Sequence, residues 1–225
     1  MDLAHMFDPV AAGIVIGGTL GATVLRSGLA DCRAAIRAVR ALFEPKFQDD
    51  IVRGALAPMV AQAEREGLMR LSLRPCVEAS IDAALTALVQ TRSLAAFASC
   101  DDSAREIRVA HALRAVRTLA LWAELSPVFG LAGTLVSLSQ LPAEGLARGA
   151  FMGAISMAVL TTLYGLLLGN LLLAPLSRAV ERRVEGEEAA RRDITNWLIA
   201  KLAPVCPPVQ SGSGAARRAY LREAG

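Results

Sequence analysis

Two uncharged segments of the chain carry hydroxyl side chains where leucine would be less costly in lipid. They span residues 125–143 and 149–177, and their hydroxyl residues include Thr134, Ser137, Thr161 and Thr162. In a membrane helix such a hydroxyl commonly bonds back to a carbonyl of its own helix and does nothing else. Two facing helices would nevertheless gain a small polar lining in an otherwise apolar bundle. The pattern therefore predicts an ion path.

Neither segment supplies an ionisable carrier for such a path. Both lack Asp, Glu, Lys and Arg, although Glu124 lies just before the first. A proton or ion path through a membrane usually needs an ionisable group. We therefore expect this chain to provide hydroxyls and walls while a partner helix provides the carboxylate.

Other kinds of chemistry have little support in the sequence. No nucleophile, base and orienting residue occur together and no phosphate-binding loop is present, so an enzyme is not expected. No Cys/His cluster has metal-ligand spacing, so neither a metal nor a cofactor is expected. The net charge of +3 is small and its positive residues interleave with acidic ones, which argues against nucleic-acid binding.

The composition indicates that these segments cross a membrane. Of the 225 residues, 54% are hydrophobic, and they gather in blocks rather than with an amphipathic period. A span needs about 20 mostly apolar residues, and residues 9–25 form a third candidate. The sequence therefore predicts an all-α, polytopic membrane protein with three transmembrane helices.

Positive charges predict the orientation of these spans. Lys and Arg number none before the first span, 14 between the first and second, one between the second and third, and nine after the third. The positive-inside rule then places the amino terminus outside and the carboxyl terminus inside. The expected parts are a membrane span over 1–26, a helical cytoplasmic loop over 27–117, paired channel-forming spans over 118–177, a cytoplasmic helix over 178–203 and a disordered tail over 204–225.

The cytoplasmic loop is expected to be almost wholly helical. The predicted helices continue the first span to near Pro45, run from Asp49 to Glu66 with a bend at Pro58 and an end at Gly67, run from about Pro75 to Thr91, and start again at a cap near Asp102 or Ser103. The last of these helices should lead directly into the second span.

Three arginines share one helical face close to the first span. They are Arg33, Arg37 and Arg40. A solvated face that helps to hold the topology is favoured over a specific lipid site.

Small residues predict close packing in all three spans. Helices in lipid have little hydrophobic drive to associate, so their contact depends on small side chains. The predicted packing residues are Gly13, Gly17 and Gly21 in the first span, Gly130 and Gly133 in the second, and Ala158, Gly165 and Gly169, together with Thr162, in the third. We expect each stripe to face protein.

Two prolines bracket the cytoplasmic ends of the second and third spans. Pro127 and Pro175 each remove a backbone donor and can bend a helix. They either mark the change from membrane helix to cytoplasmic extension or act as functional hinges, and both interpretations stay open.

Several stretches resemble a known family. LSPVFGLAGTLVSLSQL at 125–141 and MAVLTTLYGLLLGNLLLAPLSRAVERR at 157–183, joined by a short hairpin, resemble the paired core helices of the MotA/TolQ/ExbB ion-channel family. The TTLYG run with Asn170 and Pro175 is most similar to flagellar stator A subunits. Residues 8–26 resemble the second membrane helix of those stators, and EREGLMRLS at 64–72 resembles one of their loop motifs.

The resemblance implies a homo-oligomeric ring of A subunits around a pair of single-span B subunits, whose aspartate carries the proton or sodium ion. Ion flow would move the ring against the B pair, which is mechanical work without covalent catalysis. Carried over by position, the residues concerned are Thr134, Thr161 and Thr162 for the ion path, Pro127 and Pro175 for conformational change, and Glu124 for the acid just before the first proline.

Two departures from the stator pattern affect this expectation. Flagellar A subunits have a further membrane helix before the glycine-rich one, so the expected topology here is the three-span, N-out form of ExbB and TolQ. Their loop motif commonly has Arg where this chain has Glu64 and Glu where it has Ser72, at positions tied to rotor contact. Arg65 would replace the first by a shift of one residue.

Three functions remain in competition at this point. The favoured one is the A subunit of a proton- or sodium-driven stator in the bacterial inner membrane, working with a B subunit of the MotB/PomB type on a flagellar rotor. The second is a subunit that energises envelope transport with an ExbD/TolR-type partner. The third is a membrane scaffold that conducts nothing. In each case the chain is a multi-pass protein surrounded by lipid.

Overall fold

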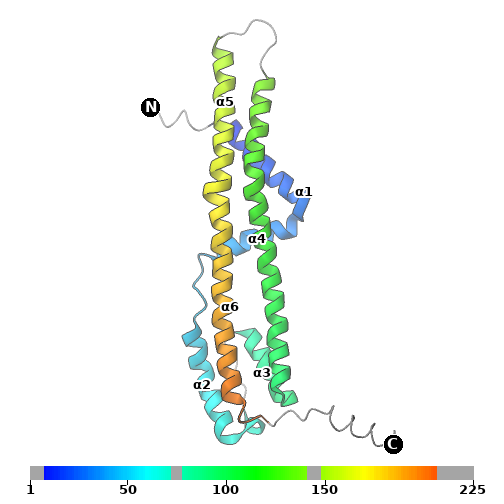
Figure 1. Cartoon of the computed structure of the whole chain (residues 1–225), viewed down its shortest axis with the longest axis vertical. Coiled ribbons are helices and arrows are strands. Elements are labelled where there is room, and N and C mark those ends of the chain that lie inside the picture. Colours follow the sequence, from blue (N-terminus) through cyan, green and yellow to red (C-terminus); the bar gives the residue numbers. More distant parts are fainter. Residues whose placement is uncertain (1–7, 72–77, 141–147, 207–225) are drawn as a thin grey trace, which may run out of the picture. The chain divides into compact units, whose positions relative to one another are not determined.

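The computed structural model describes residues 8–71, 78–140 and 148–206, and these are almost wholly helical, with no strand among them (Figure 1). The elements are α1 (Pro9–Ala41), α2 (Asp49–Glu66), η2 (Leu68–Arg70), α3 (Ala79–Thr91), α4 (Leu94–Ser139), α5 (Arg148–Leu166), the π-helical η3 (Leu167–Leu173) and α6 (Ala174–Leu202). Three helical stretches are long and apolar enough to cross a membrane: Pro9–Ala41, Leu94–Ser139 and Phe151–Leu202. The predicted all-α fold with three spans is confirmed.

The chain divides into two compact units. The membrane unit consists of Met1–Lys46 and Ile107–Glu187, and the loop unit consists of Phe47–Glu106 and Glu188–Gly225. All three uncharged segments belong to the membrane unit. The helices α4 and α6 each contribute residues to both units.

The first helix begins at a strong cap and turns sharply within its length. The carboxylate of Asp8 accepts from the N–H groups of Val10 and Ala11, at 2.8 and 3.3 Å. At Gly28 the backbone leaves the helical region, with φ 83° and ψ 161°, a conformation that glycine alone adopts without strain. The sequence predicted an unbroken helix here, and the prediction missed this turn, which Figure 1 shows as a change of direction in α1.

Beyond the turn, α1 packs across two other helices of the membrane unit. Ala35 is completely buried and forms a small core with Leu119 of α4 and Val180 of α6. Partly buried apolar residues surround these three: Ala38 and Val39 from α1, Leu42 directly after it, Val116 and Trp122 from α4, and Leu176 and Val184 from α6. This core holds the second half of α1 against the paired helices.

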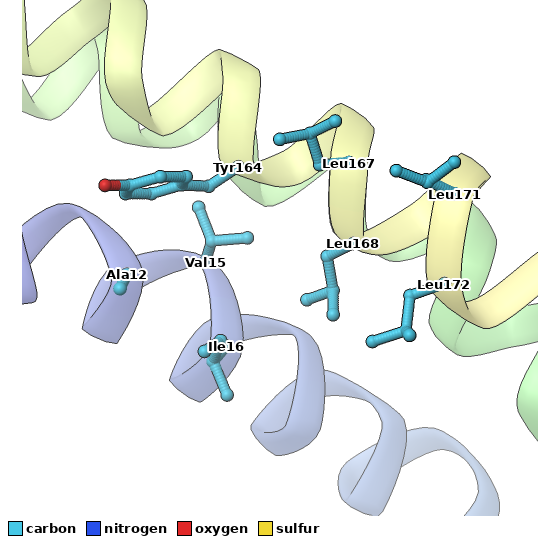
Figure 2. A pocket seen from close by; sticks show the side chains of 8 residues that line it. All are labelled: Ala12, Val15, Ile16, Tyr164, Leu167, Leu168, Leu171 and Leu172. Carbon is cyan, nitrogen blue, oxygen red and sulfur yellow. The ribbon is translucent and has the colours of Figure 1, made fainter. Parts of the chain in front are cut away.

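Before the turn, α1 and the α5–η3 helix enclose an apolar groove of about 350 Å³ (Figure 2). Its lining residues are Ala12, Val15, Ile16, Tyr164, Leu167, Leu168, Leu171 and Leu172. The only polar group drawn in Figure 2 is the hydroxyl of Tyr164.

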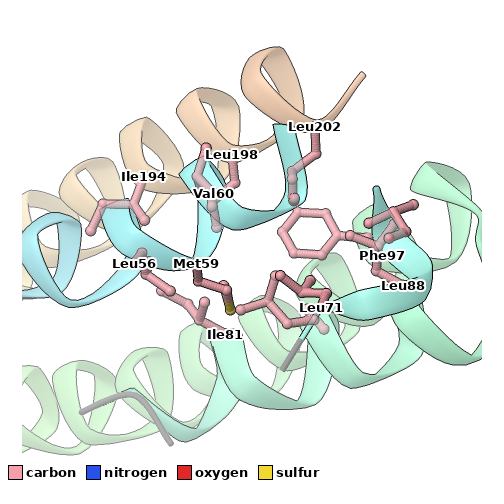
Figure 3. Close-up of a cluster of buried hydrophobic side chains, with 14 of the residues drawn as sticks. Leu56, Met59, Val60, Leu71, Ile81, Leu88, Phe97, Ile194, Leu198 and Leu202 are labelled. Atoms are coloured by element: carbon pink, nitrogen blue, oxygen red, sulfur yellow. The ribbon is translucent and has the colours of Figure 1, made fainter. Parts of the chain in front are cut away.

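The loop unit has its own hydrophobic core (Figure 3). Side chains from α2, α3, the start of α4 and the end of α6 meet there, and Phe97 and Leu198 are among the most deeply buried. Pro58 does not divide α2, which runs continuously to Glu66 and ends at Gly67 with φ 78°. The predicted end of α2 is therefore confirmed.

The start of α4 differs from the prediction. The helix begins at Leu94, where the Ser93 hydroxyl accepts from the N–H of Ala96 at 3.4 Å. Asp102 and Ser103 lie inside the helix, and Ser103 donates to a carbonyl of its own helix. The predicted cap was wrong because Arg92, in left-handed conformation, ends α3, and Ser93 directly after it already caps the next helix.

Some predicted features lie outside the described residues. They are residues 142–147 of the hairpin predicted over 142–148, residues 207–225 of the tail predicted over 204–225, and the segment 72–77, which holds Ser72 and the start of the helix predicted from Pro75.

Candidate functional site

The backbones of α4 and α5 touch at a pair of glycines. A Cβ placed on Gly165 would lie 2.6 Å from the carbonyl oxygen of Ser126 and 2.9 Å from the Cα of Gly130. A Cβ placed on Gly130 would lie 2.9 Å from the carbonyl oxygen of Thr161. Each neighbour is backbone and has little freedom to move, so only glycine fits at either position.

The same close contact continues along the helix pair. A Cβ on Gly133 would lie 2.9 Å from the Cβ and Cγ2 atoms of Thr161. A Cβ on Gly169 would lie 2.6 Å from the carbonyl oxygen of Ala123 and 3.0 Å from the Cδ atom of Pro127. Four glycines therefore form one line of contact, which we call the glycine seam: Gly130, Gly133, Gly165 and Gly169.

The first span packs through a different face from the predicted stripe. Gly13, Gly17 and Gly21 are exposed, and nothing described lies within 4 Å of a Cβ built on any of them. Gly18 instead lies directly against the ring of Phe129 on α4, where a Cβ would overlap the ring. The three predicted glycines thus form an open stripe on the surface of the chain.

Each hydroxyl predicted to line the path donates to a carbonyl of its own helix. The bonds join Thr134 Oγ1 to Leu131 O at 2.6 Å, Ser137 Oγ to Gly133 O at 2.8 Å, Thr161 Oγ1 to Ala158 O at 2.9 Å and Thr162 Oγ1 to Ala158 O at 3.2 Å. The hydroxyl hydrogens are therefore committed, and the lone pairs of the oxygens remain as acceptors. Such oxygens suit a cation or a protonated acid.

Burial separates these four hydroxyl residues into two pairs. Thr161 and Ser137 are enclosed, with 0% and 2% of their surface exposed. Thr134 and Thr162 are only half-buried, as is Ala158, which accepts from both neighbouring threonines of α5. Thr134 and Thr162 are therefore the two of these four residues that keep part of their surface open.

Several further buried hydroxyl residues of the membrane unit were not predicted. Thr19 and Thr23 on α1 and Ser126 on α4 are buried and donate to carbonyls four residues earlier. Ser177 differs because its Oγ donates across helices, to the carbonyl of Val116 at 3.2 Å. The four-residue spacing of the two threonines on α1 was the signal available in the sequence.

Tyr164 connects the paired helices to the first span. Its hydroxyl oxygen accepts from the backbone N–H of Asp8 at 3.1 Å, and its ring lines the apolar groove. Asp8 also caps α1 through its carboxylate. These contacts fix the start of α1 against α5.

The helix of the third span changes its hydrogen bonding beside the predicted prolines. In η3 the N–H of Ala174 bonds to the carbonyl of Gly169, five residues earlier, and Pro175 follows without an N–H of its own. Pro127 lies against Gly169 from the facing helix. A π-helical segment next to proline is a place where helices bend.

The remaining predicted residues lie on the surface. Glu124 and Pro175 are exposed. Glu64 and Arg65 are exposed near the end of α2, and the Glu64 carboxylate lies 3.7 Å from Nζ of Lys201. Among the described residues, no group of three or more His, Cys, Asp or Glu side chains is arranged to hold a metal ion.

Sequence comparison finds one family and two relatives. The model described as "MotA/TolQ/ExbB proton channel family" matches residues 73–193, more than half of the chain. "Motility protein A" of Borreliella burgdorferi is 38% identical over 69 residues, which are 31% of this chain and 26% of that relative. "Motility protein A" of Cereibacter sphaeroides is 25% identical over 188 residues, which are 80% of this chain and 71% of that relative.

Two solved structures share the fold. "Structure of the flagellar MotAB stator complex from Bacillus subtilis" matches with a TM-score of 0.79 and 21% identity, covering 98% of this chain and 90% of that one. "Structure of C. jejuni MotAB" matches with a TM-score of 0.81 and 18% identity, covering 92% and 82%. Both similarities extend over nearly the whole chain.

Proposed function

The chain belongs to the MotA/TolQ/ExbB proton channel family, and from this premise we propose that it is the A subunit of an ion-driven stator complex of the flagellar motor. Members of this family are membrane channel and stator subunits rather than enzymes. The relatives named motility protein A and the fold shared with two MotAB complexes support the flagellar role.

The glycine seam is the observation that carries this proposal. It brings two apolar helices into backbone contact, and on the same helices Thr134 and Thr162 stay half-buried with lone pairs left on their hydroxyl oxygens. These oxygens can accept from a protonated carboxylic acid or coordinate a sodium ion. Thr161 and Ser137 are enclosed. Their role is therefore to pack the two helices together beside the path.

The carboxylate that carries the ion belongs to a partner in this proposal. The uncharged segments 125–143 and 149–177 contain no acid or base, and a path without an ionisable group conducts poorly. A single-span B subunit with a membrane-embedded aspartate would supply it. Copies of the present chain would form a ring around a pair of such subunits, in the bacterial inner membrane.

The π-helical segment next to the prolines is the place where we expect the third span to change direction. Protonation of the partner acid would alter its contact with the hydroxyl face, and η3 with Pro127 and Pro175 would absorb the change in helix direction. Glu124 lies on the surface at the end of the span, where it would meet the cytoplasm. The distribution of Lys and Arg supports an orientation with the start of α1 outside.

Reconstitution with the partner tests ion conduction. The chain and a candidate B protein from the same organism are co-purified and placed in liposomes, and proton and sodium entry are measured separately. Flux that needs both proteins and stops when the partner aspartate becomes Asn supports the proposal. Absence of any flux from an assembled complex would identify a scaffold.

Deletion of the gene tests the flagellar role. Loss of swimming with normal envelope integrity and nutrient uptake is the expected result. Intact swimming with failed envelope transport would assign the chain to the ExbB/TolQ type instead, and would leave the conduction result unaffected.

A further inference from the structure

The segment of α1 after Gly28 lies where the spans end. Residues 29–41 turn away from the first span and cross α4 and α6 (Figure 1). The buried contacts of Ala35 are Leu119 and Val180, which lie just beyond the uncharged segments of those two helices. The segment is therefore placed at the boundary of the membrane rather than within it.

Part of its surface is apolar and yet uncovered. Leu29 and Ile36 are exposed by 60% and 46%, seven residues apart and so on one side of the helix, and Phe43 continues the same spacing just after the helix, exposed by 87%. We call these three residues the apolar stripe. It borders the buried face and is not part of it, because the buried residues of this segment are Cys32 and Ala35.

Positive charge lies directly beside the apolar stripe. Arg33, Arg37 and Arg40 are exposed on the next face of the helix, and none of them pairs with a carboxylate in the described part of the chain. Asp31 is the only acid between Gly28 and the end of the helix, and at about 100° per residue it lies on another face. We call these three arginines the basic stripe.

We propose that the two stripes form a docking surface for anionic phospholipids. The apolar stripe enters the boundary between headgroups and acyl chains, and the guanidinium groups of the basic stripe bind the lipid phosphates. A helix that combines one apolar and one basic face at the membrane surface is the form that this interaction requires. A purely solvated face would explain the arginines but not the adjacent exposed leucine, isoleucine and phenylalanine.

The proposed docking surface explains why α1 turns at Gly28. The glycine conformation lets the helix leave the membrane and run along its surface. Bound lipid would then hold the cytoplasmic end of α1 while α4, α5 and η3 move. This inference does not depend on ion conduction.

Lipid titration of the intact protein tests the basic stripe. Purified full-length protein in neutral detergent is titrated with phosphatidylglycerol or phosphatidylcholine, and bound lipid is counted by native mass spectrometry. Each arginine near an anionic lipid contributes about fivefold in affinity. The triple variant R33Q/R37Q/R40Q should lose on the order of 100-fold for phosphatidylglycerol, with phosphatidylcholine unchanged.

The matched control removes three exposed arginines from the loop unit, as R65Q/R92Q/R192Q. It has the same net charge as the test variant and should bind phosphatidylglycerol as the unmodified chain does. Equal binding by the test variant would overturn the proposal. So would dissociation of the oligomer with unchanged lipid binding per subunit, because the stripes would then be a contact between copies.

Contact quenching tests the apolar stripe separately. Ile36→Trp and, as control, Arg92→Trp are reconstituted in bilayers whose acyl chains carry bromine, and the emission of the unmodified protein is subtracted. The tryptophan at position 36 should be quenched severalfold more than that at position 92. Equal quenching at both positions would place the stripe away from lipid and overturn the inference.

Discussion

Neighbouring threonines of α5 have different surroundings although both donate to the carbonyl of Ala158. Thr161 is enclosed and its methyl group faces Gly133, whereas Thr162 keeps part of its surface open. We therefore expect Thr162→Ala to lower ion flux severalfold, because a hydrogen bond accepted from a neutral, protonated acid contributes about 0.5–1.5 kcal/mol. Flux into liposomes containing the assembled complex measures this.

Thr162→Ser is the control for that prediction. It keeps the hydroxyl and should retain most of the flux. Thr161→Ala removes packing against Gly133 and should instead weaken the contact between α4 and α5. Its main effect should be a lower unfolding temperature rather than a lower flux. Full flux through Thr162→Ala would remove Thr162 from the path.

The distance from each glycine to its neighbours decides whether it can be replaced by a larger residue. Gly165→Ala would put a methyl group 2.6 Å from the Ser126 carbonyl oxygen, so we expect a loss of about 1–3 kcal/mol and poor assembly. Gly13→Ala is the comparison, because nothing described lies within 4 Å of its Cβ. Thermal unfolding of the isolated chain in detergent measures both. Equal unfolding temperatures of the two variants would contradict this prediction. They would show that α4 and α5 can move apart at the glycine seam with little loss of stability.

Spacing along the sequence predicted the glycine seam but could not select the packing face of α1. Gly13, Gly17 and Gly21 form a regular stripe, yet the contact with Phe129 is made by Gly18. A stripe of small residues indicates that another helix can approach closely. Only the tertiary arrangement decides where that helix lies. The open stripe therefore remains available to other chains.

At the scale of elements, the sequence predicted the three spans and most of the helices of the loop. It missed the turn at Gly28 and the π-helical segment before Pro175. The stretches before and after Gly28 each fit a helix, and isolated glycines are tolerated in helices, so the pattern carried no break. Pro127 of α4 meets Gly169 within the π-helical segment, and a single-helix pattern does not contain that contact.

Arg183 holds the end of the first helix against α6. Its guanidinium donates to the carbonyl oxygens of Leu42, Glu44 and Pro45 at 3.0–3.1 Å, and its Nε lies 2.9 Å from the Glu187 carboxylate. The side chain is only 13% exposed. Arg183→Gln should therefore cost about 1.5–3 kcal/mol and free the turn after α1.

Hydrogen exchange over residues 39–45 measures this effect. Exchange should rise severalfold in Arg183→Gln and stay unchanged in Arg182→Gln, which alters an exposed neighbour. Unchanged exchange in the first variant would mean that the small core around Ala35 holds the turn without the arginine.

At the scale of the whole molecule, the division into two units implies that ion conduction and the stability of the loop unit can be changed independently. The loop unit has a core of its own, and the membrane unit is held by the glycine seam and the core around Ala35. Damage to one core should therefore leave the other unit folded. The two kinds of loss can then be told apart in one protein.

Phe97→Ala tests this separation. Phe97 is 1% exposed, and removing its ring should cost about 3–5 kcal/mol in the loop unit. Hydrogen exchange should rise across α2 and α3 while α5 keeps the protection of the unmodified chain. Ion flux should persist, and swimming should fail if the loop unit carries the rotor contact at Glu64 and Arg65. A parallel rise of exchange in α5 would show that the two units fold as one, and that a contact with the rotor can alter the ion path directly.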